Sequence, residues 1–280
     1  MAYQTREQIR QQKENEAMEN YLYNWYDEGK LKINYHSAKG YSYQMKELKM
    51  KRLVDWDFNT KTGKPKYPVQ QYHSSLINMN GLNVQDYNAH RDNEIHRLHS
   101  RLTSLQKECR NFVSYDNTEL ASIDISNSQP YLMCLLFNPL FWQQDSNIPL
   151  NFYSLPANIQ NRFSPDLINK VKEYVGELDA EEVKYYRWNA SNGIMYEYIM
   201  ERAKSIGLTL TRKKAKEMML TVFFSKNKFF YQKGAELKRM FNMLHPSIYG
   251  LIKLIKSNNH ADFACLLQAV ESTIILNKCC

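Results

Sequence analysis

Polar and apolar positions divide the chain into a polar first part and a helix-rich remainder. The segment 5–26 is rich in Glu, Gln and Arg with scattered apolar residues, a pattern typical of a mostly exposed helix. Between 55 and 80 the chain consists mainly of Asn, Thr, Gly, Lys, Pro and Tyr, which favour turns and loops. The segment 83–112 returns to a composition compatible with helix. We therefore place a domain boundary at residue 80.

A short strand is predicted over 119–126, because its residues alternate between two kinds of side chain. The apolar set is Ala121, Ile123 and Ile125, and the polar set is Ser122, Asp124 and Ser126. The following segment, 128–137, is apolar and helix-like, whereas 138–163 is irregular and interrupted by prolines.

Helices dominate the rest of the chain. They are predicted at 165–178, 192–206, 210–224, 229–244, 247–257 and 261–276. Many helices with few strands indicate a helix-rich α+β fold with a small antiparallel sheet. The last helix runs into Asn277-Lys278-Cys279-Cys280 without a cap or a polar tail, so we expect the chain to be interrupted there.

The composition favours a polyanionic partner. Lys and Arg number 37 against 29 Asp and Glu, which gives a net charge of +8 and a pI of about 9.0. A solvated cationic surface accounts for the same charge without any nucleic acid. No apolar run approaches the ~20 residues of a membrane span, residues 1–20 lack the apolar centre of a secretory signal, and the 5 cysteines lack zinc or disulfide spacing. We expect a cytoplasmic protein with no membrane partner.

Asp124 is the first candidate for chemistry. A carboxylate on a rigid strand, with small polar neighbours on its own face, can present an oxygen ligand to Mg²⁺. Magnesium commonly combines one or two such carboxylates with phosphate oxygens of a substrate. The alternative is that Asp124 lies on the solvent-exposed face of a half-buried strand, which is the simpler interpretation of an isolated Asp.

The helix predicted at 210–224 is the second candidate. At about 100° per residue, Arg212, Lys216 and Phe223 fall within about 40° of one another, and Leu220 and Phe224 continue along the flank. A face that is cationic at its start and aromatic at its end can hold a triphosphate by charge and stack a base on a ring. The alternative is a basic amphipathic helix with core aromatics and solvated lysines.

Two further segments bear on nucleic-acid binding. The segment 96–110 gathers basic side chains, among them Arg97 and Arg101, which could neutralise backbone phosphates. A charged exposed helix is the alternative. Gln268 and Glu271 lie one turn apart on an otherwise apolar helix, so they need polar partners if they are buried. A satisfied structural pair is their default interpretation.

In chain order these segments resemble the polymerase motifs of the family A (DNA polymerase I-like) DNA polymerases. Residues 124–129, Asp-Ile-Ser-Asn-Ser-Gln, resemble motif A, whose leading aspartate binds magnesium at the end of a palm strand. The resemblance implies that Asp124 is the catalytic metal ligand, with the Ile125 carbonyl as a second donor. Gln129 stands where DNA polymerases of the family usually carry the glutamate that screens the sugar 2′-hydroxyl, so deoxyribose selectivity is left open.

Arg212, Lys216, Phe224 and Ser225 follow the motif B spacing of arginine, three residues, lysine, seven residues, then tyrosine and glycine. The resemblance implies that Arg212 and Lys216 grip the incoming triphosphate, Leu220 lies against the sugar, and Phe224 lies under the templating pair. Phe in place of Tyr removes a hydroxyl, and Ser in place of Gly adds bulk at the helix end.

The remaining matches are looser. Arg97 and Arg101 lie in a stretch similar to the one that contacts template and primer before motif A. Gln268 lies in a helix similar to the glutamine helix that precedes motif C. The resemblance implies palm at 81–163, helical fingers at 164–260 and a return to the palm at 261–280, with no role assigned to 1–80. Motif C, a His-Asp pair that supplies the second metal carboxylate, should come next, so we expect these 280 residues alone to show little or no synthesis.

The activity implied by the resemblance is template-directed nucleotidyl transfer in DNA replication, with Mg²⁺ as cofactor and with primer-template DNA and deoxynucleoside triphosphates as partners. The limited room for an exonuclease domain favours a phage or mobile-element replication system. Two alternatives stay open: a single-subunit RNA polymerase, whose motifs A and B share this layout, and a non-catalytic nucleic-acid-binding replication accessory protein. An accessory protein would bind nucleic acid in a salt-sensitive way that is indifferent to Asp124→Asn.

Overall fold

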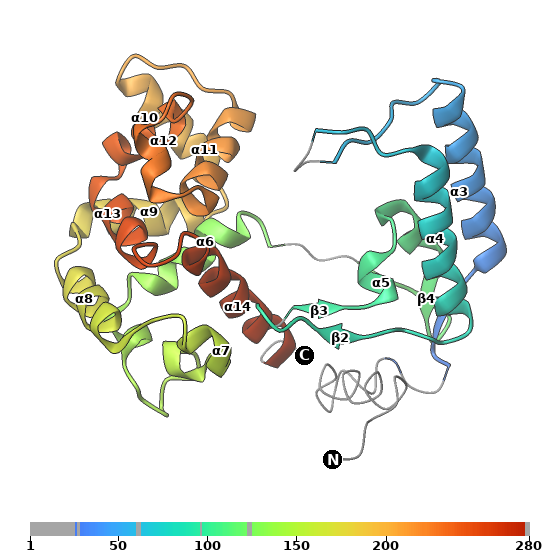
Figure 1. Cartoon of the computed structure of the whole chain (residues 1–280), viewed down its shortest axis with the longest axis horizontal. Coiled ribbons are helices and arrows are strands. Elements are labelled where there is room, and N and C mark those ends of the chain that lie inside the picture. Colours follow the sequence, from blue (N-terminus) through green and yellow to red (C-terminus); the bar gives the residue numbers. More distant parts are fainter. Residues whose placement is uncertain (1–25, 27–28, 60–62, 96, 122–124, 278–280) are drawn as a thin grey trace. The chain divides into compact units, whose positions relative to one another are not determined.

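The computed structural model describes residues 26, 29–59, 63–95, 97–121 and 125–277 (Figure 1). These residues form two compact units: unit 1 contains the described residues of 26–92 and 97–121, and unit 2 contains residues 93–95 and 125–277. Helices predominate, and the strands form one antiparallel sheet of three and one of two. The prediction of a helix-rich α+β fold with a small antiparallel sheet is therefore confirmed.

Unit 1 pairs two long helices with a small sheet. The sheet has the order β1-β4-β5, and Ile33 of β1 lies opposite Val113 of β4. The helices α3 and α4 pack side by side (Figure 1), and Met79 and Leu82 of α4 are buried in a core with these two strand residues. The elements of unit 1 are β1 (Leu31–Ile33), α3 (Tyr35–Met50), α4 (Pro68–Asn83), β2 (His90–Arg91), β3 (Leu98–His99), α5 (Arg101–Ser104), η1 (Lys107–Phe112), β4 (Val113–Tyr115) and β5 (Thr118–Glu119).

The loop predicted over 55–80 is wrong in its second half, where α4 begins at Pro68. Proline suits this first helical position, because its missing N–H would have no partner inside the helix. The helix predicted over 83–112 is also wrong, since that stretch forms the β2–β3 hairpin, α5 and η1. The expected boundary at residue 80 falls inside α4.

The strand predicted over 119–126 is shorter than expected. Strand β5 ends at Glu119, and both of its residues are exposed. Ala121 and Ile125, expected on a buried face, are exposed and lie outside any strand. At the described positions 121 and 125 the alternation therefore does not mark a buried strand. Residues 122–124, Asp124 among them, lie outside the described part of the chain.

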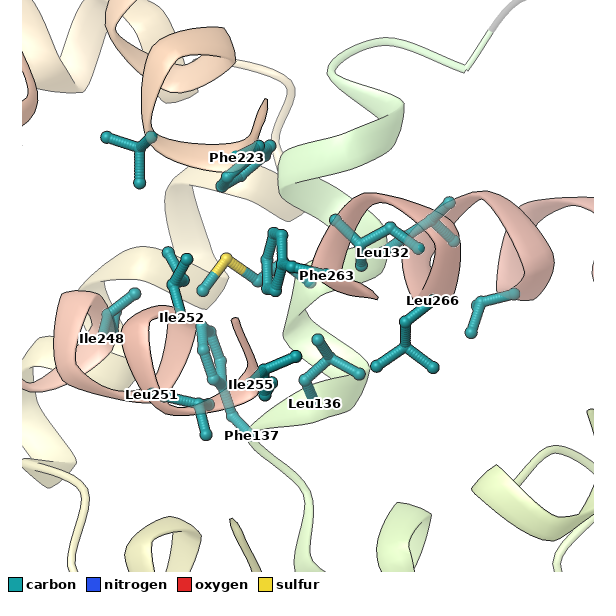
Figure 2. Close-up of a cluster of buried hydrophobic side chains, with 14 of the residues drawn as sticks. Leu132, Leu136, Phe137, Phe223, Ile248, Leu251, Ile252, Ile255, Phe263 and Leu266 are labelled. Carbon is teal, nitrogen blue, oxygen red and sulfur yellow. The ribbon is translucent and has the colours of Figure 1, made fainter. Parts of the chain in front are cut away.

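Unit 2 is built from helices around one continuous core, part of which Figure 2 shows. Ile159 and Leu167, on either side of the boundary expected at 163/164, share that core, as do Ile255 and Phe263 on either side of 260/261. The elements are α6 (Ser128–Leu136), η2 (Pro139–Trp142), η3 (Phe152–Ser154), α7 (Ala157–Gln160), α8 (Pro165–Gly176), α9 (Ala180–Ser191), α10 (Met195–Ser205), α11 (Arg212–Phe224), η4 (Asn227–Tyr231), α12 (Glu236–Leu244), α13 (Pro246–Ile255) and α14 (Asp262–Asn277).

Most helices of unit 2 were predicted from the sequence. The predictions at 128–137, 165–178 and 210–224 correspond to α6, α8 and α11. The prediction at 229–244 is only partly right, because η4 and a turn precede α12, and α9 was not predicted as a separate helix. Within the described ranges, no helix combines the length and apolar character needed to cross a membrane.

Candidate functional site

Helix α11 presents one face to the core and the opposite face to solvent. It starts after Thr211, whose hydroxyl accepts a hydrogen bond from the Lys214 N–H at 3.3 Å, so the first turn is capped. The core face consists of Ala215, Met218, Met219, Val222 and Phe223, all buried. This burial fixes the rotation of the helix about its axis and thereby decides which side chains face outward.

The outward side chains include Arg212, Lys216, Leu220 and Phe224, all of them exposed. They are spaced four residues apart, so each is displaced by only about 40° from the one before, and together they form a line that we call the α11 stripe. Phe223, which the sequence placed within the same 40° as the two cations, is instead a core residue whose ring lies 5.1 Å from that of Phe263 (Figure 2).

The two cations of the α11 stripe differ in their surroundings. Arg212 Nε lies 2.7 Å from Glu197 Oε1 on α10, and its guanidinium lies 5.2 Å from the centre of the Tyr196 ring. The hydrogen bond from Arg212 lowers the pKa of Glu197. Lys216 has no ion pair with any described residue. Because the Arg212–Glu197 pair is solvent-exposed and therefore weak, its carboxylate can be exchanged for a phosphate.

Two buried lysines hold the C-terminal end of α11. Lys238 of α12 donates to Ser225 Oγ at 3.0 Å, and Lys256, directly after α13, donates to the Val222 carbonyl at 2.8 Å and to the Ser225 carbonyl. Burial lowers the pKa of Lys238 to about 8, and burial together with the charge of Lys238 lowers the pKa of Lys256 to about 7. These hydrogen bonds satisfy carbonyls at the end of α11, so the last turn, which carries Phe224, is tied to α12 and to the end of α13.

The motif A segment leads into α6. Asp124, the expected catalytic and metal-binding residue, lies outside the described residues, and Ile125 is exposed just before a turn. Asn127, at the N-terminus of α6, has a left-handed backbone with φ of 54°. Gln129 Nε2 donates to Glu271 Oε2 on α14 at 3.4 Å, whereas Gln129 Oε1 is buried without a partner among the described residues.

The structure gathers α6, α11 and α14 around one core. In Figure 2, Phe223 of α11 faces Phe263 of α14, and Leu132 of α6 lies beside Leu266 of α14. Gln268 is half-buried on α14, one turn before the Glu271 that accepts the hydrogen bond from α6. The three segments that carry the resemblance thus belong to one packed unit.

The arginines expected to contact template and primer lie in unit 1. Arg97 is exposed just before β3, and its backbone N–H donates to Asp92 Oδ2 at 3.0 Å. Arg101 is largely covered, since its guanidinium donates to Asp86 Oδ2 and its Nε donates to the Asp86 carbonyl, each at 2.7 Å. It also fills the space above Gly81, where an added Cβ would overlap Arg101 Cδ. Arg101 therefore has a structural role within unit 1.

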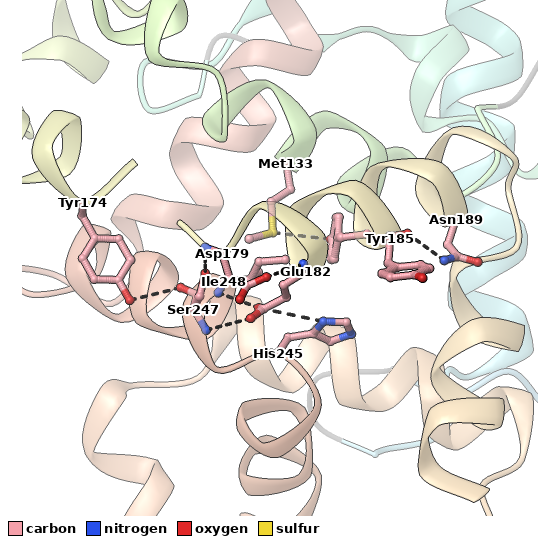
Figure 3. Close-up of polar contacts among 10 residues, drawn as sticks. Met133, Tyr174, Asp179, Glu182, Tyr185, Asn189, His245, Ser247 and Ile248 are labelled. Carbon is pink, nitrogen blue, oxygen red and sulfur yellow. Dashed lines mark hydrogen bonds and ion pairs between the residues drawn. The ribbon is translucent and has the colours of Figure 1, made fainter. Parts of the chain in front are cut away.

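A buried polar junction fixes α13 against α9 (Figure 3). The Glu182 carboxylate accepts hydrogen bonds from the N–H groups of Ser247 and Ile248 at 3.1 and 2.8 Å, which satisfies the free donors at the start of α13. His245 Nδ1 lies 4.0 Å from Glu182 Oε1, and burial lowers the pKa of His245 to about 3. These groups position the helices from inside the core.

No protein-family model, curated protein sequence or solved structure matches the chain. The case for a function therefore rests on its own residues. Among the residues that the structure describes, no cluster of three or more His, Cys, Asp or Glu side chains could hold a metal ion. The Mg²⁺ site expected at Asp124 stays a prediction.

Sequence reasoning missed three groups that shape the site. Glu197, which pairs with Arg212, lies on a separate helix, so no local pattern indicates the pairing. Lys238 and Lys256 lie on or next to apolar helices, and lysine at such positions usually reaches solvent with its charged end. The available signal was their place inside or beside the apolar segments 237–244 and 248–255.

Proposed function

We propose that the chain takes part in template-directed nucleotidyl transfer, as in a DNA polymerase, and that α11 binds the incoming nucleoside triphosphate. The α11 stripe carries this proposal. It places a lysine that forms no ion pair with a described residue, together with a weakly paired arginine, at one end of a line whose other end is an exposed phenylalanine ring. Cations of this kind bind phosphates, and aromatic rings stack on bases. The cations and the ring follow each other along α11 in the same order as the phosphates and the base in a nucleotide.

Each residue of the α11 stripe has a distinct role in this proposal. Arg212 and Lys216 bind the phosphates, Leu220 lies against the sugar, and Phe224 lies under the base. A magnesium ion held at Asp124 would neutralise phosphate charge. In the proposed reaction the primer 3′-hydroxyl loses its proton and forms a bond to the α-phosphorus, while the bond from that phosphorus to the departing pyrophosphate breaks. The side chains of α11 contribute by orientation and charge, since phosphoryl transfer depends mainly on positioning and electrostatic stabilisation.

A single-subunit RNA polymerase-like activity is a second candidate, and one observation favours it. The Gln129 amide donates to Glu271, which leaves Oε1 as an unpartnered acceptor within the described part of unit 2. A neutral acceptor can take a hydrogen bond from a ribose 2′-hydroxyl, whereas a glutamate that packs against the sugar excludes it. Affinity for ribo- and deoxynucleoside triphosphates should therefore be compared side by side.

Nucleotide binding by the full chain tests the proposal. We expect a deoxynucleoside triphosphate with Mg²⁺ to bind the wild type, and Lys216→Ala to weaken that binding about tenfold or more. Lys214→Ala is the matched control, because Lys214 is an exposed lysine on the same helix, about 160° around from Lys216. Equal binding by the two variants would contradict the assignment of α11.

The variant Asp124→Asn separates a polymerase from an accessory protein. An accessory protein would bind single-stranded or duplex DNA with a strong salt dependence and with no response to the triphosphate or to Asp124→Asn. A nucleotidyltransferase would instead show Mg²⁺-dependent triphosphate binding that Asp124→Asn weakens. Calorimetry with each ligand on each variant gives the answer.

A further inference from the structure

Unit 1 contains a cavity of about 770 Å³ that has no part in the function proposed for α11. It lies between α3, the loop that follows α3, the first half of α4, and η1. Its volume is in the range of small-molecule sites in proteins. Polar side chains and lysines make up most of its lining, with Tyr41 and Tyr67 as aromatic walls.

Two residues of α4 that line this cavity carry buried polar atoms without a hydrogen-bond partner in the described part of the chain. Ser75 is only 2% exposed, and its hydroxyl forms no hydrogen bond with any residue that the structure describes. Gln71 lies one turn earlier on the same face of α4. Its Oε1 is also buried and also forms no hydrogen bond with a described residue. Such atoms are rare in folded proteins, because each has lost water without a replacement. A ligand in the cavity would supply the missing hydrogen bonds.

The orientation of the Gln71 amide is fixed by Asp57. Gln71 Nε2 donates to Asp57 Oδ2 at 2.7 Å, and Lys49 Nζ binds the same oxygen at 2.6 Å. These two bonds lower the pKa of Asp57, which is therefore an ionised acceptor. A flipped amide would turn its oxygen toward this carboxylate, so Oε1 has to be the free atom. The ligand must accordingly offer an N–H or O–H group to Gln71.

The rim of the cavity is charged and partly aromatic, with the carboxylates of Asp55 and Glu108 as well as lysines. Lys66 and Lys107 are exposed at the rim, and neither forms an ion pair with a described residue. Tyr67 is 57% exposed, and its ring is held edge-on against Trp56 at 5.6 Å between ring centres. The cavity thus combines hydrogen-bonding groups on its floor, a flat ring surface, and at its mouth two lysines that form no ion pair with a described residue.

We propose that this cavity binds a nucleotide whose base carries an exocyclic amino group. The amino group donates to Gln71 Oε1, the base edge contacts Ser75 Oγ, the base lies against Tyr67, and the phosphate reaches Lys66 and Lys107. A neutral sugar would satisfy the floor but would leave the lysines unused, and a simple anion would leave the floor unpaired. The nucleotide is either free or part of a single strand, since both present the same groups.

Calorimetric titration of the full chain with adenosine monophosphate, uridine monophosphate and an oligodeoxyadenylate tests this site. Ser75→Ala removes a hydroxyl that has no partner in the described chain, so the variant should fold. We expect it to weaken binding of adenosine monophosphate about fivefold to tenfold. Ser37→Ala, at an exposed position of α3 outside the cavity, is the matched control and should bind as the wild type does.

The base and phosphate assignments have their own readouts. Uridine monophosphate, which lacks the amino group, should bind about fivefold more weakly than adenosine monophosphate. The double variant Lys66→Ala/Lys107→Ala should weaken binding of adenosine monophosphate and leave that of adenosine unchanged. Binding of the oligodeoxyadenylate alone would support the site and identify its ligand as a strand.

Three outcomes would overturn the inference: no binding of either adenine ligand at millimolar concentration, equal binding by Ser75→Ala and Ser37→Ala, or no preference over uridine monophosphate. Lys216→Ala keeps this test independent of the function proposed for α11. Binding that Lys216→Ala abolishes and Ser75→Ala leaves intact would belong to α11 and would contradict a site in unit 1.

Discussion

Lys256 donates its ammonium group to the carbonyl of Val222 at 2.8 Å, deep in unit 2 and without a carboxylate partner among the described residues. The carbonyls at the end of a helix lack partners inside the helix, and a lysine from another segment here takes the place of water. The arrangement ties the end of the candidate nucleotide-binding helix α11 to the helices that follow it. It also makes the stability of unit 2 depend on pH.

The lowered pKa of Lys256 predicts that the protein becomes more stable as pH rises from 7 toward 10. In this range the lysine is protonated in the unfolded chain but largely neutral in the folded one, so the unfolded state binds more protons and a rise in pH disfavours it. The free energy of unfolding should rise by at most about 1.4 kcal/mol per pH unit for this group. Urea unfolding at pH 7, 8 and 9 measures the slope.

Lys256→Met should flatten that slope, and the contribution of Lys238, whose pKa is lowered to about 8, should remain. Lys253→Met is the control, because Lys253 is exposed on α13, the helix that Lys256 follows. A wild-type stability that is constant or falls between pH 7 and 9 would contradict the account of both buried lysines.

Adjacent phenylalanines on α11 should respond to truncation in opposite ways. Phe223→Ala removes a fully buried ring that packs on Phe263 and should lower the free energy of unfolding by about 3–5 kcal/mol. Phe224→Ala removes an exposed ring and should lower it by less than about 1 kcal/mol. Phe224→Ala should instead weaken triphosphate binding about tenfold, the loss of one stacking contact. Urea unfolding and nucleotide titration of both variants provide the measurements.

Glu197→Gln should strengthen triphosphate binding about twofold to fivefold. Glu197 competes with phosphate for Arg212, and an exposed ion pair of this kind contributes about 0.2–1 kcal/mol. Glu201→Gln, an exposed position of the same helix α10, removes an equal charge and serves as the control. If both variants bind the triphosphate with the same gain, the effect is one of net charge and Arg212 has no special part in it.

Gly81 and Arg101 should be energetically coupled. In Gly81→Ala the added Cβ displaces the Arg101 side chain and breaks its hydrogen bonds to Asp86, so unit 1 should lose about 1–3 kcal/mol. In an Arg101→Ala background the same change should cost little or be favourable, because alanine is the better helix former. A double-mutant cycle by chemical unfolding should give a coupling energy of about 0.5–3 kcal/mol. Additive effects would show that Arg101 is free to move away.

Local pattern was sufficient where an element is defined by its own residues. Helix α8 begins at Pro165 after a capping Ser164 and has apolar residues at helical spacing, so its start could be read from the sequence. Helix α4 shows the opposite case, because many of its residues are polar or small and include the cavity-lining Gln71 and Ser75. Polar residues that serve a cavity hide the apolar periodicity that identifies a helix.

The candidate site was predictable in its residue types and less so in its geometry. Spacing alone placed Phe223 within about 40° of Arg212 and Lys216, with Phe224 on the flank about 100° further around the helix. Packing on Phe263 decides between them, and that contact joins residues far apart in the sequence. The pairing of Gln129 with Glu271 and of Arg212 with Glu197 likewise depends on the tertiary fold.

The sheet of unit 1 joins Leu31 to Tyr115, two residues separated by most of the unit. During synthesis on a ribosome, β1 can pair with β4 only after the chain has been made past β4. Until then α3 and α4 lack the sheet that shares their core. Closing so long a loop slows folding, and the packing of α6 on α14 in unit 2 closes a longer one still. A newly made chain therefore has incomplete packing in unit 1 until β4 has been made and in unit 2 until α14 has been made, and the helices exposed in the meantime are the parts that chaperones would meet.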